Sequence, residues 1–408
     1  MRLLYNFFIY LYAVIIYTIA PFNSKAKKWI NGRQKLFKNL KIKLQPFDNQ
    51  KERIWIHCAS LGEFEQARPV IEQIRTQKPN CFILLTFFSP SGYETRKNYK
   101  EVSMVSYLPI DTIRNAKKFL EIIKVNQIIF VKYEFWYNYM ITAKDKKIPI
   151  YYIAFILRSN QYFFKWYGKW FREQLKNISH FFAQNTDTSN YLKSIGIQNV
   201  SVVGDPRFDR VIHNSQNKKS FPIIEAWLQN SKVLVIGSSW NKDIDLLINT
   251  INNFEGKIIV APHEIKENNI QYITAKLKIP FVRYTNIQDT IPKECKILII
   301  NTIGILSQLY QYANFNYIGG GFGKGIHNTL EALAFGNPVL FGPQYKKFEE
   351  AKAIIKHGIG YTVQNQLELI ECIQKIEANP GIYQHKIKKY LLENQGASGK
   401  IIEMIINL

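Results

Sequence analysis

The segment NYIGGGFGKGIHNTLE, residues 316–331, decides the fold of the second half of this 408-residue chain. An apolar run leads into five glycines, and a helix is predicted to begin near His327. Glycines let a ligand approach the backbone closely, and a helix N-terminus favours an anion. The glycines fit neither a GxGxxG register nor a Walker loop, and such turns are often purely structural. The polar residues crowded around and after the turn instead predict ligand binding by Lys324, Gly325, His327, Asn328 and Glu331.

Short apolar runs rich in Ile, Val, Phe and Tyr alternate with longer amphipathic stretches on both sides of residues 205–231. Within most of these runs, apolar and polar residues do not alternate, which is typical of strands buried on both faces of a parallel sheet. Strands are predicted at 54–57, 81–87, 104–108, 127–131, 149–155, 180–183, 200–203, 233–237, 257–261, 280–282, 296–300, 315–318 and 338–341. We therefore predict an α/β protein with two doubly wound, Rossmann-like domains facing a cleft, each binding ligands beyond its carboxyl strand ends.

The N-terminus carries an uncharged apolar run, 3–22, of about the length that crosses a bilayer as a helix. Only Arg2 precedes this run, whereas eight Lys and Arg residues follow it before the first acidic residue, Asp48. This pattern favours a membrane anchor, spanning or embedded, with its C-terminal side cytoplasmic and the basic stretch on anionic headgroups. A cleaved signal peptide and a buried core helix are the alternatives, and Pro21 disfavours cleavage after Ala20.

The formal net charge of +23 requires a negatively charged partner or surface, although abundant Lys, Asn and Ile also suggest genomic composition bias. Nucleic acid, an anionic membrane and an acidic substrate are the candidates. Four widely separated cysteines favour buried reduced thiols over disulfides or a zinc site. No Asp-x-Asp pair stands out, so we expect no required metal and no cofactor.

The segment IWIHCASLGEFE, residues 54–65, is predicted to be a strand, a small loop and a helix that begins near Glu63. Glu63 then lies at the carboxyl edge of the first sheet, where a carboxylate can remove a proton from an acceptor hydroxyl. A first-turn carboxylate is equally typical of an ordinary helix start. Glu65 is interpreted as a solvated charge.

Four further segments place polar side chains at predicted strand ends or at the domain junction. Glu134, between aromatic residues, is a candidate for orienting a basic neighbour or a sugar hydroxyl. Ser238 and Ser239 can cap a helix or bind a phosphate. His263 follows a proline and is more often structural than catalytic in such a position, and Arg207 is a candidate ligand of a donor phosphate or carboxylate.

These segments, in this order, resemble the 3-deoxy-D-manno-octulosonic acid (Kdo) transferases of the GT-B glycosyltransferase class over nearly the whole chain. The resemblance is carried by SLGE (60–63), EFW with Asn138, GSSW (237–240), APHE (261–264), GIHNTLE (325–331), GNPVLFGP (336–343) and KFEE (347–350). It implies transfer of Kdo from CMP-Kdo to a lipid A precursor at the cytoplasmic face of the inner membrane, in lipopolysaccharide core biosynthesis. No nucleic-acid partner is implied.

By this resemblance Glu63 matches the catalytic base, and Ser238, His263, Gly325, Asn328 and Glu331 match donor-binding positions. Ser60 and Gly62 belong to the same motif as Glu63. Four positions depart from the family pattern: Lys132 stands where a Glu is frequent, Tyr137 where a Pro is frequent, Arg207 where a Lys is common, and Asn301 where an Asp often stands in the segment before Gly304. These differences concern individual donor and acceptor contacts and leave an inverting transfer with a single base as the expected reaction.

The predicted organisation is an anchor (1–22), a basic juxtamembrane segment (23–50), an acceptor-binding domain (51–204), a connector (205–231), a donor-binding domain (232–390) and a C-terminal helix (391–408). A GT-B enzyme that uses a UDP-sugar in envelope biosynthesis has the same gross pattern. A basic, membrane-tethered nucleic-acid-binding protein is the alternative outside the enzymes, but the sequence has no RNP, helix-turn-helix or zinc pattern.

Overall fold

The computed structural model describes residues 1–323 and 325–406, which form two compact units. The first unit comprises Met1–Asp209 together with Gln395–Leu408, and the second comprises Arg210–Asn394. The division falls inside the segment predicted to be a connector. That segment instead forms α10 (Arg207–Gln216) and α11 (Pro222–Leu228), and the second helix buries Ile224, Trp227 and Leu228.

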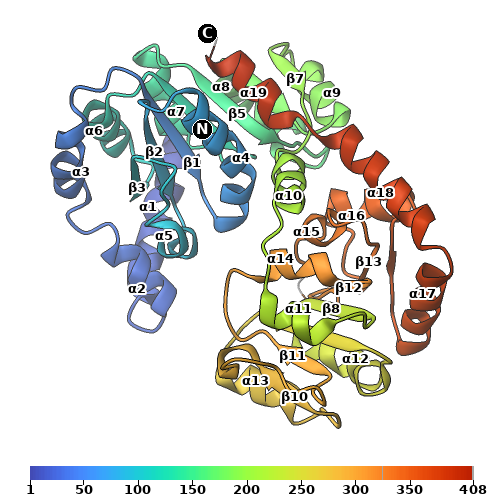
Figure 1. The fold of residues 1–408 in the computed structure, drawn as a ribbon. Helices are drawn as coiled ribbons and strands as arrows, with labels where there is room; N and C mark the ends of the chain where they lie inside the picture. The colour runs from blue at the N-terminus through green and yellow to red at the C-terminus, as the bar shows by residue number, and fades with distance from the viewer. Residues whose placement is uncertain (324, 407–408) are drawn as a thin grey trace. The chain divides into compact units, whose positions relative to one another are not determined.

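The first unit is built on a parallel sheet of seven strands in the order β3-β2-β1-β4-β5-β6-β7 (Figure 1). The strands are β1 (Arg53–Cys58), β2 (Phe82–Phe87), β3 (Met104–Tyr107), β4 (Gln127–Val131), β5 (Ile150–Phe155), β6 (His180–Ala183) and β7 (Val200–Val202). The helices are α1 (Arg2–Ile19), α2 (Ser24–Asn31), α3 (Leu36–Leu44), α4 (Leu61–Gln77), α5 (Pro90–Arg96), α6 (Ile113–Ile123), α7 (Tyr137–Asp145), α8 (Lys169–Leu175), α9 (Thr186–Ser194) and α19 (Ala397–Ile406).

Both faces of this sheet are buried, which explains why its strands lack the alternation of a half-exposed strand. Along β1, Trp55 joins one hydrophobic cluster with α3, α6 and α7, whereas Ile54 and Ile56 join another with α4 and α19. The buried hydrophobic residues of α4 all lie in the second cluster: Phe64, Ala67, Val70, Ile71 and Ile74. The last helix of the chain thus completes the core of the first unit.

The second unit repeats the architecture with a parallel sheet in the order β10-β11-β9-β8-β12-β13-β14. Its strands are β8 (Val233–Ser239), β9 (Lys257–Pro262), β10 (Phe281–Arg283), β11 (Ile297–Ile299), β12 (Phe315–Ile318), β13 (Val339–Phe341) and β14 (Gly360–Thr362). Besides α10 and α11, its helices are α12 (Asn241–Asn253), α13 (Glu267–Thr274), α14 (Leu306–Leu309), α15 (Leu330–Leu333), α16 (Glu349–Lys356), α17 (Gln366–Ala378) and α18 (Pro380–Asn394). Every predicted strand is present, and the sequence analysis missed only the short edge strand β14.

In each sheet the strand order reverses direction between two neighbouring strands, β1 and β4 in the first unit and β8 and β12 in the second. Loops that leave such neighbours run to opposite faces of the sheet, which leaves a crevice outside their carboxyl ends. Ligands of doubly wound proteins bind at this position, so the loops after β1, β4, β8 and β12 are where a site is expected.

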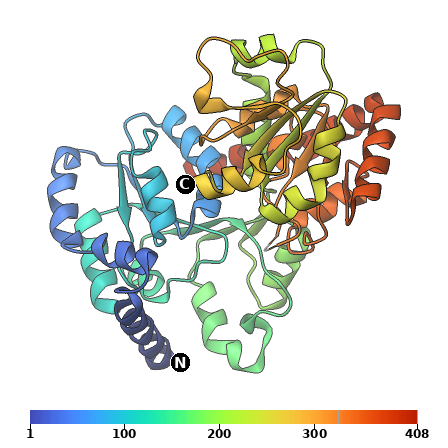
Figure 2. The same ribbon diagram turned by 90° about the horizontal axis from the view of Figure 1, so that it is seen from below.

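The N-terminal segment forms α1, and in Figure 2 it is the dark-blue helix that ends at the N-terminus. By length and composition, it is the one helix among the described residues that is able to cross a membrane, with a mean hydropathy of 1.5. The basic segment that follows packs on the first unit, because Leu36, Leu40 and Leu44 of α3 are buried in its core.

Candidate active site

In the first unit, Glu63 lies two residues inside α4, directly after the loop that follows β1. Ser60 is the N-cap residue, and its Oγ accepts a hydrogen bond from the Glu63 N–H at 3.4 Å. The Glu63 Oε2 atom accepts a hydrogen bond from the Ala59 N–H at 2.5 Å. Glu63 therefore has the structural role of a helix-start carboxylate. Gly62 beside it is exposed, and a Cβ atom there would meet the Ser60 Oγ at 3.9 Å, an ordinary van der Waals contact.

Glu134, which follows β4, lies next to Glu63, so the two carboxyl groups meet where the strand order reverses. Their side chains are close enough to affect each other's pKa, and a hydrogen bond between them would need a proton on one of the two carboxyl groups. Glu63 is only 6% exposed. Burial and the Glu134 carboxylate raise the pKa of Glu63 well above its usual range, and burial also raises the pKa of Glu134.

Lys132 supplies the opposing charge at this edge of the first sheet. Its charge lowers the pKa of Glu63, of Glu134 and of Asp205, so it lies close to all three carboxyl groups. Its backbone adopts a left-handed conformation, with φ of 58°, which is uncommon for a residue other than glycine and turns the chain sharply after β4. At the position where Kdo transferases frequently have a second acid, this chain therefore places a cation.

Arg207, the first residue of α10, is bound to a neighbouring carboxylate of the same unit. Its Nε and Nη2 atoms donate to the Asp205 Oδ2 atom at 2.9 and 2.7 Å, and Gln66 of α4 donates to the same oxygen at 3.4 Å. Burial alone would raise the pKa of Asp205, but the charge and hydrogen bonds of Arg207 outweigh it and hold that pKa below its ordinary value. The guanidinium is thereby oriented by an aspartate that the sequence analysis did not single out.

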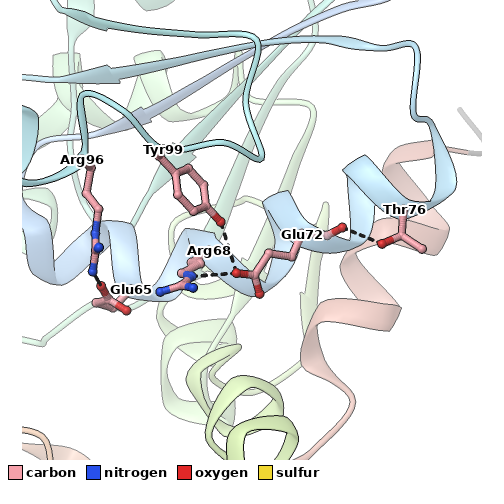
Figure 3. Close-up of polar contacts among 6 residues, drawn as sticks. All are labelled: Glu65, Arg68, Glu72, Thr76, Arg96 and Tyr99. Carbon is pink, nitrogen blue, oxygen red and sulfur yellow. Dashed lines mark hydrogen bonds and ion pairs between the residues drawn. The ribbon is translucent and has the colours of Figure 1, made fainter. Parts of the chain in front are cut away.

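Glu65 is not the solvated charge that the sequence suggested. Figure 3 shows it beside Arg96, whose Nη2 donates to the Glu65 Oε1 at 2.9 Å. Two turns further along α4, Glu72 accepts from Arg68 at 2.6 Å and from the Tyr99 hydroxyl at 3.2 Å. This network joins α4 to α5 and the loop after it, and so holds the helix that carries Glu63.

The second unit has a cavity of about 700 Å³ at the corresponding point of its sheet. Its walls come from the ends of β8, β9 and β12 and from α12 and α13. The lining residues are Ser239, Trp240, Asn241, Lys242, Asp243, Pro262, His263, Glu264, Asn269, Ile273, Gly323, Gly325 and His327. Four residues predicted from the sequence, Ser239, His263, Gly325 and His327, thus line one cavity.

Three stacked rings form one wall of this cavity. The ring centroids of Trp240 and His263 are 4.6 Å apart, and those of His263 and His327 are 4.1 Å apart. The Trp240 indole N–H donates to the His327 Nε2 at 2.9 Å, so this nitrogen is an unprotonated acceptor. Burial, followed by the neighbouring His263, lowers the pKa of His327 to about 4, and burial also lowers the pKa of His263. The wall is therefore aromatic and uncharged at neutral pH.

Polar groups at the base of the cavity organise the glycine-rich turn. The Asp243 carboxylate accepts hydrogen bonds from the backbone N–H groups of Trp240 and Gly320 and from the Tyr317 hydroxyl, at 2.8 to 2.9 Å. Gly325 has a φ of 128°, and a Cβ atom there would meet the Phe348 ring at 2.7 Å. The Ser239 hydroxyl is buried and has no hydrogen-bond partner among the described residues, so it is available to a ligand.

The remaining predicted residues lie elsewhere. The helix expected to begin near His327 begins only at Leu330 and has four residues, too few to give an anion-binding N-terminus. Asn328, two residues before this helix, accepts a hydrogen bond from the Leu330 N–H at 3.2 Å, and the charge of Glu331 acts on Arg210. Ser238 forms the bulge of β8 with a φ of 53° and does not line the cavity. Lys324 is outside the described residues.

The sequence analysis did not select Trp240, Asp243, Lys132 or Asp205 as site residues. Trp240 and Asp243 had a usable signal, because both stand at the start of the helix that follows the first strand of the second domain. Among residues 1–323 and 325–406, no group of three or more His, Cys, Asp or Glu side chains is placed to hold a metal ion.

Two doubly wound units, each with its polar site at the reversal of its sheet, are the architecture of GT-B proteins. Residues 33–210 match the family described as 3-deoxy-D-manno-octulosonic-acid transferase (kdotransferase). The chain is therefore similar to the Kdo transferases, and this match covers 178 of its 408 residues.

Curated relatives extend the similarity over most of the chain. The 3-deoxy-D-manno-octulosonic acid transferase of Rickettsia prowazekii is 26% identical over 360 residues, which cover 84% of this chain and 77% of that protein. A bifunctional glycosyltransferase/methyltransferase of Fusobacterium nucleatum is 25% identical over 385 residues, and the match spans 90% of this chain but only 59% of that longer protein. Among solved structures, UDP-GlcNAc 2-epimerase from Neisseria meningitidis shares the fold, with a TM-score of 0.62 at 17% identity over 87% of this chain and 100% of that one.

Proposed function

We propose that this protein transfers Kdo from CMP-Kdo to a hydroxyl group of a lipid A precursor, with inversion of configuration. The match of residues 33–210 to the Kdo transferase family and the names of the relatives support this reaction. The observation that carries the proposal is the buried Glu63–Glu134 pair beside Lys132 at the reversal point of the first sheet. Such a pair is suited to accept a proton in a reaction near neutral pH.

In the proposed reaction Glu63 is the catalytic base. The acceptor hydroxyl oxygen attacks the anomeric carbon of Kdo, and the hydroxyl proton moves to Glu63. The bond between that carbon and the phosphate oxygen breaks, and CMP leaves with both electrons. A single displacement with one base inverts the anomeric centre. The neighbouring Glu134 makes Glu63 a stronger base than an ordinary carboxylate, because its charge disfavours the ionised form of Glu63.

The CMP-sugar is proposed to bind the cavity of the second unit. The uncharged wall of Trp240 and His263 can stack on a planar base, and the buried Ser239 hydroxyl can hydrogen-bond a polar group of the donor. Lys242 at the rim of the cavity brings a positive charge suited to a phosphate. Gly325 and His327 contribute to the same lining, so part of the donor site predicted from the sequence is retained.

We further propose that the enzyme works at the cytoplasmic face of the inner membrane, held there by its N-terminal helix and by attraction of its basic residues to anionic lipid. A lipid acceptor explains why a glycosyltransferase carries an uncharged apolar helix. The net charge of +23 then serves the membrane surface and acceptor phosphates rather than nucleic acid.

The test is transfer from CMP-Kdo to a tetra-acylated lipid A precursor in detergent, followed by mass spectrometry, with UDP-sugars as competing donors. We expect product from CMP-Kdo alone. Product from a UDP-sugar and none from CMP-Kdo would favour a different envelope glycosyltransferase. Tight, steeply salt-dependent binding of a plain oligonucleotide, with no transfer from any donor, would favour the nucleic-acid alternative.

A further inference from the structure

The N-terminal helix α1 exposes a large apolar surface on one side. Its exposed side chains, continuing to Phe22 just beyond the helix, are Leu3, Leu4, Phe7, Phe8, Leu11, Val14, Ile15, Ile19 and Phe22. Phe22 is 94% exposed. A contiguous apolar surface of this kind is rare on a protein surrounded by water and indicates contact with lipid or with another protein.

The opposite side of α1 is bound to the first unit from its first turn. The Tyr5 hydroxyl donates to the Asp111 Oδ2 at 2.5 Å, and the Asn138 Nδ2 donates to the Asn6 Oδ1 at 2.8 Å. Asp111 and Asn138 are both fully buried, and Asp111 also accepts from the backbone N–H groups of Asn138 and Tyr139. The beginning of the helix thus completes a buried polar cluster, which would lose hydrogen bonds if the helix left.

The rest of α1 contacts the same unit. The Tyr12 ring lies 6.2 Å from Trp29 and 6.0 Å from Phe88, centroid to centroid, and Ala20 just after the helix is buried. Tyr5 and Ala20 are about 22 Å apart along a helix axis, at 1.5 Å per residue. If α1 crossed a hydrocarbon core of about 30 Å, Tyr5 and Ala20 would lie near opposite sides of the membrane, and a domain next to Ala20 could not also contact Tyr5. Contacts at both ends with one domain are therefore incompatible with crossing.

Aromatic and basic residues flank both ends of the apolar surface. Next to the first turn, Trp170 lies 6.3 Å from the Tyr5 ring, and one turn before it Trp166 is 90% exposed between Lys165 and Lys169. After Phe22, at the other end, come Lys25, Lys27 and Lys28. Exposed tryptophan beside lysine is the composition that favours the boundary between hydrocarbon and anionic headgroups.

We propose that α1 does not span the membrane but lies flat in the anionic cytoplasmic leaflet, docked on the first unit through Tyr5 and Asn6. The choice of leaflet rests on the proposed function. The exposed side of α1, Phe22 and Trp166 form the lipid-contacting surface, and the adjoining lysines bind the headgroups. The sequence left spanning and embedding open, because both need the same apolar length.

Cross-linking in intact membranes tests the docking. Asn6→Cys and Asn138→Cys are combined in a Cys372→Ser background and treated with a short bifunctional thiosulfonate. We expect most of the protein to form an intramolecular cross-link. Phe8→Cys with Asn138→Cys is the matched control, because Phe8 lies on the exposed side at nearly the same height, and it should give only background. Equal cross-linking of the two pairs, or none of the first, overturns the proposal.

A second measurement does not depend on the double variant. Single cysteines at Arg2 and at Lys28 are labelled with a membrane-impermeant maleimide in spheroplasts and in inverted vesicles. We expect both to react only in inverted vesicles. Reaction of Arg2→Cys in spheroplasts, or in neither preparation until detergent is added, overturns flat docking while leaving membrane attachment intact. If the wild-type protein does not float with vesicles of phosphatidylethanolamine and phosphatidylglycerol, the proposed membrane location itself fails, and flat docking with it.

Discussion

The two units place their polar sites at the same point of the same fold, yet one site is built from ionisable groups that interact and the other is largely uncharged. In the first unit, five ionisable groups interact with one another at the edge of the sheet: Glu63, Glu134, Lys132, Asp205 and Arg207. In the second, burial holds His263 and His327 in the uncharged state beside Trp240. One fold thus provides a site suited to moving a proton and another suited to binding a planar, polar ligand.

The largest expected effect comes from removing the base. Glu63→Gln should lower the transfer rate by about 10²- to 10⁴-fold, because general base catalysis contributes that much. The affinity for CMP, measured by calorimetry, should stay unchanged, since the donor cavity is in the other unit. Glu65→Gln, two residues further along α4, is the control and should keep its activity. Full activity of Glu63→Gln would remove this residue from the proposed mechanism.

Removing the aromatic wall should affect binding instead. Trp240→Ala is expected to weaken CMP binding by about 10-fold or more, in line with roughly 1–3 kcal/mol for a base stacked on an aromatic ring. Trp166→Ala is the matched control, because it removes an exposed tryptophan from the first unit. If both variants bind CMP equally in a detergent titration, the cavity does not hold the base.

The pH dependence of transfer should separate the neighbours of Glu63. The base is active when deprotonated, so the rate should rise with pH above the ordinary range of a carboxyl group. Glu134→Gln removes a negative neighbour, lowers the pKa of Glu63 and should shift the rise to lower pH. Lys132→Gln removes a positive neighbour and should shift it to higher pH. Shifts in the same direction would contradict this electrostatic arrangement.

The smallest effect concerns the network that holds α4. Glu72→Gln weakens the contacts with Arg68 and Tyr99, which are partly exposed, so the free energy of unfolding should fall by about 0.5–1 kcal/mol. Chemical denaturation measures this change, and transfer activity should remain that of the wild type. A large loss of activity would mean that this network positions Glu63 more tightly than its exposure suggests.

Much of the fold could be predicted because local sequence determines it. Buried parallel strands need continuous apolar runs, and these were recognisable at every strand except β14, which has three residues and begins with Gly360. The end of each strand was equally recognisable, so Glu63, Ser239 and His263 were correctly predicted to lie at the carboxyl edges of the sheets. The start of α15 was misplaced, because a glycine-rich turn extends to Leu330 without any local signal for its length.

The sequence by itself determined two doubly wound units, the resemblance to Kdo transferases, the apolar N-terminal helix and the strand ends that carry polar residues. The tertiary structure decided which of those residues meet. From the sequence, Lys132 was only a replacement of a frequent acid, but in the fold its charge acts on Glu63 and Glu134. Glu65 was interpreted as solvated, but it accepts a hydrogen bond from Arg96. In the tertiary structure, Asn328 and Glu331 do not line the cavity, although the nearby Gly325 and His327 do. Apolar periodicity is a local property of the chain, whereas the partner of a charge depends on contacts between distant segments, which a sequence pattern does not contain.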